Sequence, residues 1–169
     1  MDIKTLCLGI LSLGDATGYE IKKMVAEGSF SFFSEASFGS IYPALTKLTD
    51  EGFITCRSET QSNRPDKKIY SLTKLGVKEL EGTLEKSPKP DKNRSEFLAA
   101  LLFAEAISPN RIQNLVDERI EYHANQIKVL EDLLSEKPTG ASKFVIEYGL
   151  EMQRAAAKFL QENSKSLTD

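Results

Sequence analysis

Four residues within a stretch of eight carry the side chains with which proteins contact duplex nucleic acid. Ser40, Pro43 and Lys47 are spaced three and four residues apart, so on a helix they share one face, and Tyr42 lies beside them. A hydroxyl, a phenol and an ammonium group bind phosphates or base edges, and a proline ring can touch a thymine methyl group. The alternative interpretation is an ordinary polar face of a surface helix.

A second set of candidate residues follows in a polar stretch. Arg64, Lys67 and Lys68 lie close together in the sequence, and an exposed basic turn could reach the minor groove or the phosphate backbone. A solvated turn is the alternative, because lysine and arginine are common on protein surfaces. Tyr19 fits either a phosphate contact or a core aromatic with an exposed hydroxyl, whereas Tyr70 is predicted to be mostly structural.

These residues need helices to position them. The first helix is predicted over about 3–13. Thr17 and Glu20 then form a capping-box pattern, which starts a second helix that ends near Glu27.

A third helix, which carries the candidate contact residues, is predicted to begin within 37–40 and to end at 51–52, where glycine suits the C-terminal position. Pro43 is least costly in a first turn, so the helix either starts near 39–40 or loses one hydrogen bond. Its buried stripe consists of Ile41, Leu45 and Leu48.

Two strands are predicted after the third helix. Residues 53–59 and 68–72 are rich in β-forming residues and flank a polar turn of six to eight residues that contains Asn63 and Pro65. Thr73 then caps a fourth helix. This order of helices, strand, hairpin, strand and helix is that of a winged helix-turn-helix, and such modules mostly bind duplex DNA.

The second half of the chain is predicted to be helical, over 97–106, 108–136 and 142–162. The last two helices are joined by a short turn and should pack antiparallel, and four such helices from two chains would bury both apolar seams. The expected dimer interface consists of Val116, Ile120, His123, Ile127, Leu130 and Leu134, with Val145, Tyr148 and Met152 on the last helix. His123 on this seam could fix the register or sense pH, or be an ordinary half-exposed histidine.

Composition and charge limit the classes of function. The chain has 169 residues, of which 40% are hydrophobic and 28% charged, as in ordinary globular proteins. The net charge of −3 is unusual for a DNA-binding protein, so the positive charge must gather on one face. No apolar run approaches the roughly 20 residues that span a bilayer, and no signal-peptide pattern is found, so we expect a cytoplasmic protein without membrane contact.

Motifs for catalysis or metal binding are not found. The chain has one histidine, no Gly-rich phosphate loop and no Gly-x-Ser-x-Gly motif. Cys7 and Cys56 share no metal-ligand spacing with each other or with His123, and we expect them to be buried, reduced thiols. We therefore expect no enzyme activity, no metal and no cofactor.

Several short stretches occur in an order and spacing typical of one protein family. They are Leu8–Leu11, Gly18–Ile21, Gly39–Leu45, Glu51–Ile54 and Lys68–Gly76. Residues 1–80 thus resemble the PadR-type transcriptional regulators, and the helical half is similar in pattern to the virulence-activator branch of that family.

The resemblance implies a homodimer, held by the C-terminal helices, that binds a two-fold operator in duplex DNA, usually as a repressor and sometimes as an activator. By this resemblance the recognition-helix positions are Ser40, Tyr42, Pro43 and Lys47, and the wing positions are Arg64, Lys67 and Lys68. Some relatives bind planar aromatic effectors near the dimer interface, in certain cases against tryptophan. This chain has no tryptophan, so phenylalanine or tyrosine would have to hold a small aromatic effector.

We therefore expect a mainly α fold with a small β wing. A winged helix-turn-helix DNA-binding domain is expected over 1–85 and a linker over 86–94, followed by a dimerisation domain of long antiparallel helices over 95–163 and a frayed tail over 164–169. The expected function is sequence-specific DNA binding by a homodimer, with repression favoured. The alternatives are a winged-helix module that binds other proteins and an activator without a small-molecule effector.

Overall fold

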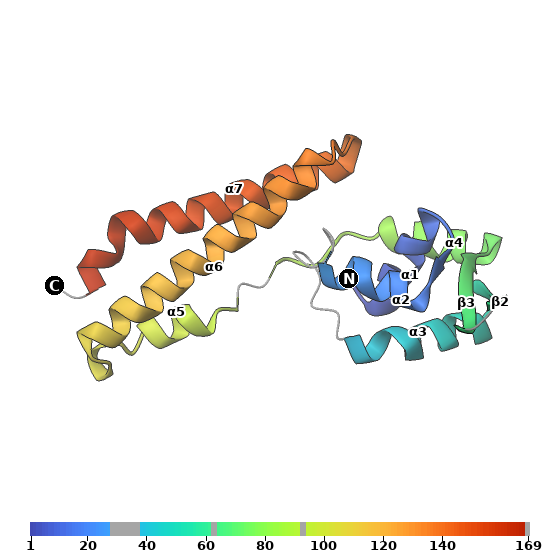
Figure 1. Ribbon diagram of the computed structural model, residues 1–169, viewed down its shortest axis with the longest axis horizontal. Coiled ribbons are helices and arrows are strands. Elements are labelled where there is room, and N and C mark those ends of the chain that lie inside the picture. Colours follow the sequence, from blue (N-terminus) through green and yellow to red (C-terminus); the bar gives the residue numbers. More distant parts are fainter. Residues whose placement is uncertain (28–37, 62–63, 92–93, 168–169) are drawn as a thin grey trace. The chain divides into compact units, whose positions relative to one another are not determined.

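The computed structural model describes residues 1–27, 38–61, 64–91 and 94–167, with their side chains except at 26–27, 38, 60–61 and 64–66. The chain divides into two compact units, Met1–Pro90 and Asp91–Asp169 (Figure 1). Each unit has its own cluster of buried apolar side chains. The boundary falls within the polar, proline-containing stretch 86–94. The separate roles expected for the two units stay predictions.

Four helices form most of the first unit: α1 (Ile3–Ser12), α2 (Gly18–Glu27), α3 (Phe38–Asp50) and α4 (Lys74–Leu84). Side chains cap the first and the last of these helices. The Asp2 carboxylate accepts a hydrogen bond from the Thr5 amide at the start of α1, and Thr73 accepts one from the Gly76 amide at the start of α4. The core between the helices contains the fully buried side chains of Ile10, Ile21, Ile41, Leu45, Leu48 and Ile54.

The proline of α3 lies beyond the first turn of the helix. Since α3 begins at Phe38, Pro43 is its sixth residue and has no N–H to donate to the carbonyl group of residue 39. A start near 39–40, which would have kept the proline in the first turn, is therefore wrong. The helix tolerates the lost bond because Pro43 lies on its exposed face, where water can reach the backbone.

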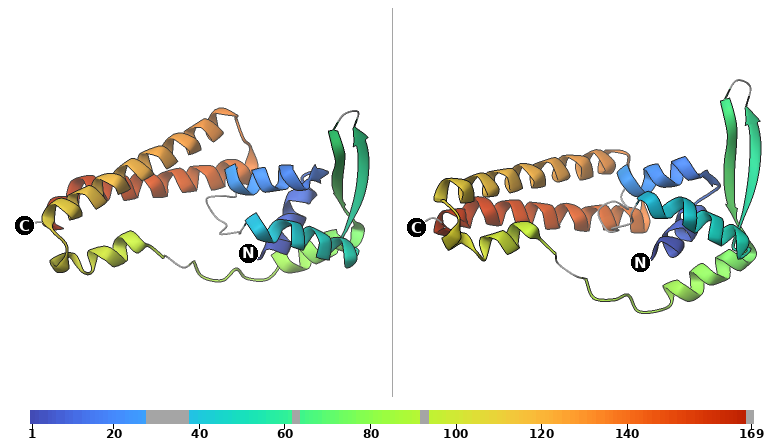
Figure 2. Two further views of the ribbon diagram at one scale, coloured as in Figure 1. Left: turned by 60° about the horizontal axis from the view of Figure 1, so that its bottom comes forward. Right: turned by 90° about the horizontal axis from the view of Figure 1, so that it is seen from below.

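Three strands, β1 (Ala16–Thr17), β2 (Ile54–Gln61) and β3 (Arg64–Leu72), form an antiparallel sheet in the order β1-β3-β2. The β2–β3 pairing runs from Ile54 opposite Leu72 to Gln61 opposite Arg64, with an irregularity between Glu59 and Gln61. In Figure 2 this hairpin extends beyond the helices of the first unit. It is the wing of a winged helix-turn-helix.

The predicted length of the turn, six to eight residues, is wrong, because β2 continues to Gln61 and β3 begins at Arg64. Pro65 lies within β3, and Asn63 is outside the described residues. Proline is tolerated in a strand where one edge carries no ladder bonds. That is the case here, since β1 pairs with β3 only at Ile69 and Tyr70.

The second unit is helical. It contains α5 (Glu96–Leu101), the 3-10 turn η2 (Ala104–Ala106), the long helices α6 (Pro109–Ser135) and α7 (Gly140–Asn163), and the 3-10 turn η3 (Ser164–Leu167). As expected, α6 and α7 lie side by side and run antiparallel (Figures 1 and 2).

Two expectations about the second unit are wrong. The predicted single helix over 97–106 ends at Leu101 and continues only as the 3-10 turn η2. The predicted frayed tail is ordered over 164–167, because Leu167 packs against the buried cluster of Phe97, Val116 and Leu160. An apolar contact late in the chain thus outweighs the polar composition around it.

Gly76→Ala should destabilise the protein, because a β-carbon at this position would collide with the backbone carbonyl of Phe53. Backbone moves aside less readily than an exposed side chain, so we expect a loss of about 2 kcal/mol in the free energy of unfolding. Urea denaturation followed by circular dichroism measures it. In the control Gly82→Ala, also on α4, the new β-carbon has nothing within 4 Å, and stability should equal or exceed that of the wild type. Equal stability of the Gly76 variant and the wild type would contradict the close packing.

Candidate nucleic-acid interface

Helix α3 presents a sharp division between its two faces. The side chains of Ile41, Leu45 and Leu48 are 0% exposed, as predicted from their spacing. Tyr42 is 51% exposed at the flank of this stripe, and Pro43 and Lys47 are exposed further round the helix, where Ser40 is half-buried. Tyr42, Pro43 and Lys47 are thus all exposed on the part of α3 outside the core, which we call the α3 face.

The cationic group of the α3 face is only weakly held by the protein. The Lys47 ammonium lies 3.9 Å from Oε1 of Glu51. The other carboxylate oxygen of Glu51, Oε2, lies 2.7 Å from the Lys4 ammonium and so forms the closer ion pair. The Lys47 side chain is 63% exposed, and exposed ion pairs of this kind contribute little. Lys47 can therefore exchange Glu51 for an external anion at small cost.

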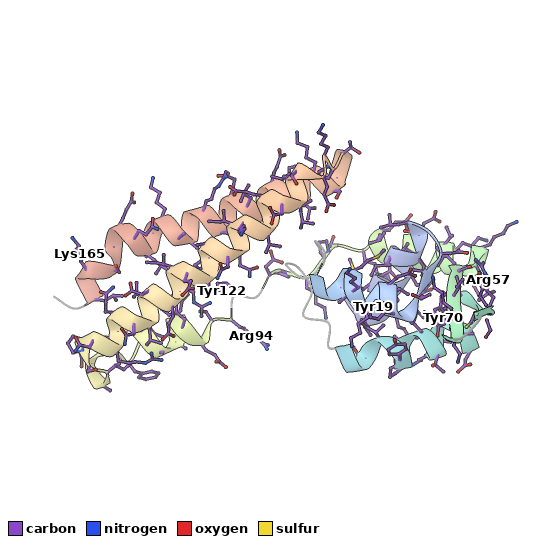
Figure 3. The ribbon with its side chains drawn as sticks, viewed as in Figure 1. Tyr19, Arg57, Tyr70, Arg94, Tyr122 and Lys165 are labelled. Atoms are coloured by element: carbon purple, nitrogen blue, oxygen red, sulfur yellow. The ribbon has the colours of Figure 1, made fainter. Side chains whose placement is uncertain are left out.

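The two ambiguous tyrosines lie in different environments (Figure 3). Tyr19 on α2 is 69% exposed, so its phenol is available to a partner. Tyr70 on β3 is 8% exposed and belongs to the core, where burial raises the pKa of its hydroxyl. The structural interpretation of Tyr70 is therefore confirmed.

The predicted wing cations lie on a strand and not in a turn. Lys67 and Lys68 are neighbours on β3, so their side chains leave opposite faces of the hairpin. The Lys67 ammonium lies 3.6 Å from the Glu20 carboxylate of α2, whereas Lys68 is exposed. Arg64 is the first residue of β3, and its side chain is outside the described ones. The expectation of one basic cluster in an exposed turn is thus wrong, because β3 already begins at Arg64.

The start of α2 is fixed by the predicted capping box. The Thr17 amide donates to Glu20 Oε2 at 2.7 Å, and the Glu20 amide donates to Thr17 Oγ1 at 3.2 Å. Hydrogen bonds from the Thr17 amide and hydroxyl, together with the Lys67 charge, lower the pKa of Glu20. This network joins α2 to the wing and places Tyr19 at the surface.

Arg57 is an exposed cation of the wing that the sequence analysis missed. It lies on β2, and its guanidinium binds the Asp15 carboxylate at 2.8 Å (Figure 3). Hydrogen bonds from Ser71 and Arg57 lower the pKa of Asp15. Alternation along the strand could have indicated that Arg57 faces away from the core, but no pattern in the sequence indicates its distant partner.

The predicted dimer seam on α6 is partly an internal seam. Val116 and Leu130 are buried within a single chain, so their assignment to the dimer interface is wrong. Val116 packs in the cluster with Phe97 of α5 and Leu160 of α7. The short turn after α6 brings α7 of the same chain against it. Ile120, Ile127 and Leu134 are half-buried. His123 is also half-buried, and its Nδ1 lies 2.6 Å from Gln153 Oε1 of α7.

Helix α7 has a second apolar stripe on the side away from α6. Its members are exposed and spaced by four, four, three and four residues. The stripe consists of Phe144, Tyr148, Met152, Ala155 and Phe159. Val145 lies at its border. Tyr148 and Met152, which were predicted to lie at the dimer interface, are therefore available to a partner, and we call this surface the α7 stripe.

The described residues contain no group of three or more side chains able to hold a metal ion. In the same part of the chain, every helix is too short or too polar to cross a bilayer.

Cys7 is buried as predicted, and burial raises the pKa of its thiol to about 11. Cys56 is exposed, contrary to expectation, because neither face of β2 is covered over residues 55–58.

Comparison with known proteins assigns both units. Residues 7–82 match the transcriptional regulator PadR-like family, and residues 93–168 match the family described as virulence activator alpha C-term. The chain belongs to the PadR-like family. Negative transcriptional regulator PadR of Bacillus subtilis is 36% identical over 120 residues, which are 70% of this chain. The match spans 65% of that relative, slightly less than two thirds of its length.

Solved structures of similar proteins match the whole PadR-like chain. The smu.1604c protein of Streptococcus mutans is 34% identical, with a TM-score of 0.87 over 96% of this chain and 98% of that one. B. subtilis PadR in complex with operator DNA is 28% identical, with a TM-score of 0.84 over 97% and 98%. The same protein in complex with p-coumaric acid is 27% identical, with a TM-score of 0.77 over 99% of both chains. The family and fold predicted from the sequence are confirmed.

Glu20→Gln should make stability less sensitive to acid. The pKa of Glu20 is lower in the folded chain, so the carboxylate stabilises the fold above its unfolded pKa, and this contribution is lost as the pH falls through the folded pKa. Between about pH 5 and pH 3 the melting temperature of the wild type should therefore fall more steeply than that of the variant. Thermal melts across this range test the difference. Glu79→Gln, at an exposed position of α4, should follow the wild type, and parallel curves for all three proteins would refute the role of Glu20.

Proposed function

We propose that this PadR-like protein binds a two-fold operator in duplex DNA as a homodimer and represses transcription. The observation that carries the proposal is the orientation of α3, whose apolar stripe is fully buried while Tyr42, Pro43 and Lys47 face outward. The operator complex of B. subtilis PadR, which is similar along almost the whole chain, supports DNA as the partner. The name of the curated relative, a negative regulator, supports repression.

In this proposal the α3 face enters the major groove. Lys47 contacts phosphate or a base edge, Tyr42 donates or accepts through its phenol, and Pro43 packs against an apolar base surface. Ser40, at the edge of the face, and Tyr19, exposed on α2, contact the phosphate backbone. The two α3 helices of a dimer would lie in successive major grooves, about 34–36 Å apart.

The wing adds contacts to the phosphate backbone. Lys68 is exposed on β3, and Arg64 begins the same strand. Lys67 must leave Glu20 before it can bind a phosphate, and the 3.6 Å separation of this exposed pair keeps that exchange inexpensive. We therefore assign the larger electrostatic contribution to Lys68 and Arg64.

Homodimerisation is assigned to the α7 stripe and to the half-buried apolar residues of α6. The stripe holds four large side chains that are exposed to solvent in the single chain, namely Phe144, Tyr148, Met152 and Phe159. Burying such side chains against a second copy removes apolar surface from water. A symmetric dimer would also contain two copies of the α3 face, as a two-fold operator requires.

A small aromatic effector is a further candidate partner. The p-coumaric acid complex of B. subtilis PadR, 27% identical to this chain, favours this class of ligand. Because the sequence contains no tryptophan, phenylalanine or tyrosine would have to stack on the ring. A rise in melting temperature with added p-coumaric acid would support effector binding.

Membership of a family of transcriptional regulators also supports a cytoplasmic place of action and the absence of enzyme activity. The same DNA contacts would also serve an activator. A reporter gene placed behind the operator distinguishes the two roles, because a repressor lowers and an activator raises its expression.

A protein-binding winged helix is the main alternative, and the net charge of −3 favours it. Salt dependence separates the two functions. Binding to duplex DNA should weaken steeply as salt rises, because each contacted phosphate releases counterions. A partner bound through apolar contacts would show little such dependence.

Lys47→Ala should weaken operator binding while leaving the dimer intact. Loss of one ammonium per α3 face should reduce affinity roughly tenfold and reduce the slope of log affinity against log salt by up to about 2 per dimer. Fluorescence anisotropy over a salt series measures both quantities. Lys78→Ala, at an exposed position of α4, is the matched control and should bind like the wild type. If both variants keep wild-type affinity, the α3 face is not the binding surface.

Met152→Asp should dissociate the dimer, because a carboxylate in the middle of the α7 stripe would have to be buried in an apolar interface. Sedimentation velocity should give the coefficient of a monomer, with an unchanged helical circular dichroism spectrum. Gln161→Asp introduces the same charge at an exposed position outside the stripe and should remain dimeric. A dimeric Met152 variant would exclude the α7 stripe from the interface.

A further inference from the structure

Gly18, the first residue of α2, lies directly against the ring of Tyr42 on α3. A β-carbon built on Gly18 would be 2.6 Å from Cε1 of that ring and 3.4 Å from both Cδ1 and Cζ. A separation of 2.6 Å is well inside van der Waals contact, so no residue other than glycine fits this position with the ring where it is. Helices α2 and α3 thus meet through the α-carbon of Gly18 and the edge of the Tyr42 ring.

The backbone conformation does not explain the glycine. Gly14, Gly52 and Gly140 have φ values of 151°, 75° and 58°, which L side chains rarely adopt, but Gly18 is not among the residues with positive φ. It also occupies the start of a helix, where alanine would be at least as favourable. The close approach of Tyr42 is therefore the physical reason for glycine at this position.

The backbone at Gly18 is held firmly, so the ring and not the helix must move if a side chain is added. Thr17 pairs with Ile69 in the sheet and closes the capping box with Glu20, which also contacts Lys67. Tyr42, in contrast, is 51% exposed and has open solvent on one side. A methyl group on Gly18 would turn the Tyr42 ring outward and leave the fold intact.

We infer that Gly18 is a positioning residue for DNA recognition: its bare α-carbon seats the Tyr42 ring and fixes the direction of the phenol on the α3 face. The inference rests on the proposed function and deepens it. A side chain fixed before binding loses little conformational freedom on forming its contact, and its direction selects among base edges. Tyr42 is thereby a specificity-determining residue whose geometry is set from α2.

A double-mutant cycle between Gly18→Ala and Tyr42→Ala tests the inference. The probe is the duplex that the full-length wild-type chain selects from random-sequence DNA, with a scrambled duplex beside it, both measured by anisotropy at fixed salt. Gly18→Ala should lower affinity for the selected duplex roughly tenfold, with little effect on the scrambled duplex. In the Tyr42→Ala background the same change should have no further effect, because the ring is gone. Melting temperatures should stay near that of the wild type, as for the control Gly82→Ala.

The outcomes are distinct. Wild-type affinity of Gly18→Ala for the selected duplex would overturn the inference and leave the proposed function standing. An equal loss in both Tyr42 backgrounds, or a fall in melting temperature that persists in the double variant, would also overturn it, because the alanine would then act on the backbone. If the wild type selects no duplex, the proposed function fails and the inference fails with it.

Discussion

Burial of one side of α3 is the constraint on which the interface depends. Ile41, Leu45 and Leu48 are each fully buried, and burial of such side chains contributes about 1.5–3 kcal/mol apiece. Rotation of α3 about its axis would expose all three together, so its orientation is strongly fixed. Burial of this stripe also determines which residues of α3 face solvent. These exposed positions do not contribute to the core, so they can hold residues that contact a partner, including a proline that costs the helix a hydrogen bond.

A second constraint joins the helices to the wing at the start of α2. The capping box of Thr17 and Glu20, the pairing of Thr17 with Ile69, and the ion pair of Glu20 with Lys67 all meet within a few residues. Gly18 then brings the Tyr42 ring of α3 against this junction. Helix α2, helix α3 and the wing, the three elements that would touch DNA, are thereby fixed relative to one another by short-range contacts. The first unit therefore acts as one rigid body.

The second unit uses its long helices differently. The seam of α6 is largely satisfied by α7 of the same chain, through buried Leu130 and the cross-helix ion pair of Arg154 with Glu131. Helix α7 has apolar residues on two sides. One side is covered by α6, and the other side, the α7 stripe, is exposed. An exposed apolar stripe of this length is unusual on a monomer and is typical of an interface between subunits.

The sequence by itself determined the family, the order of the elements, the helix caps and the buried stripe of α3, because these depend on residue periodicity and on contacts within three or four residues. Only the tertiary structure decided which charges pair, as Arg57 with Asp15 and Lys67 with Glu20, and which apolar residues of α6 remain available to a partner. It also showed that Gly18 meets Tyr42. These features join residues distant along the chain, and local patterns carry no information about such contacts.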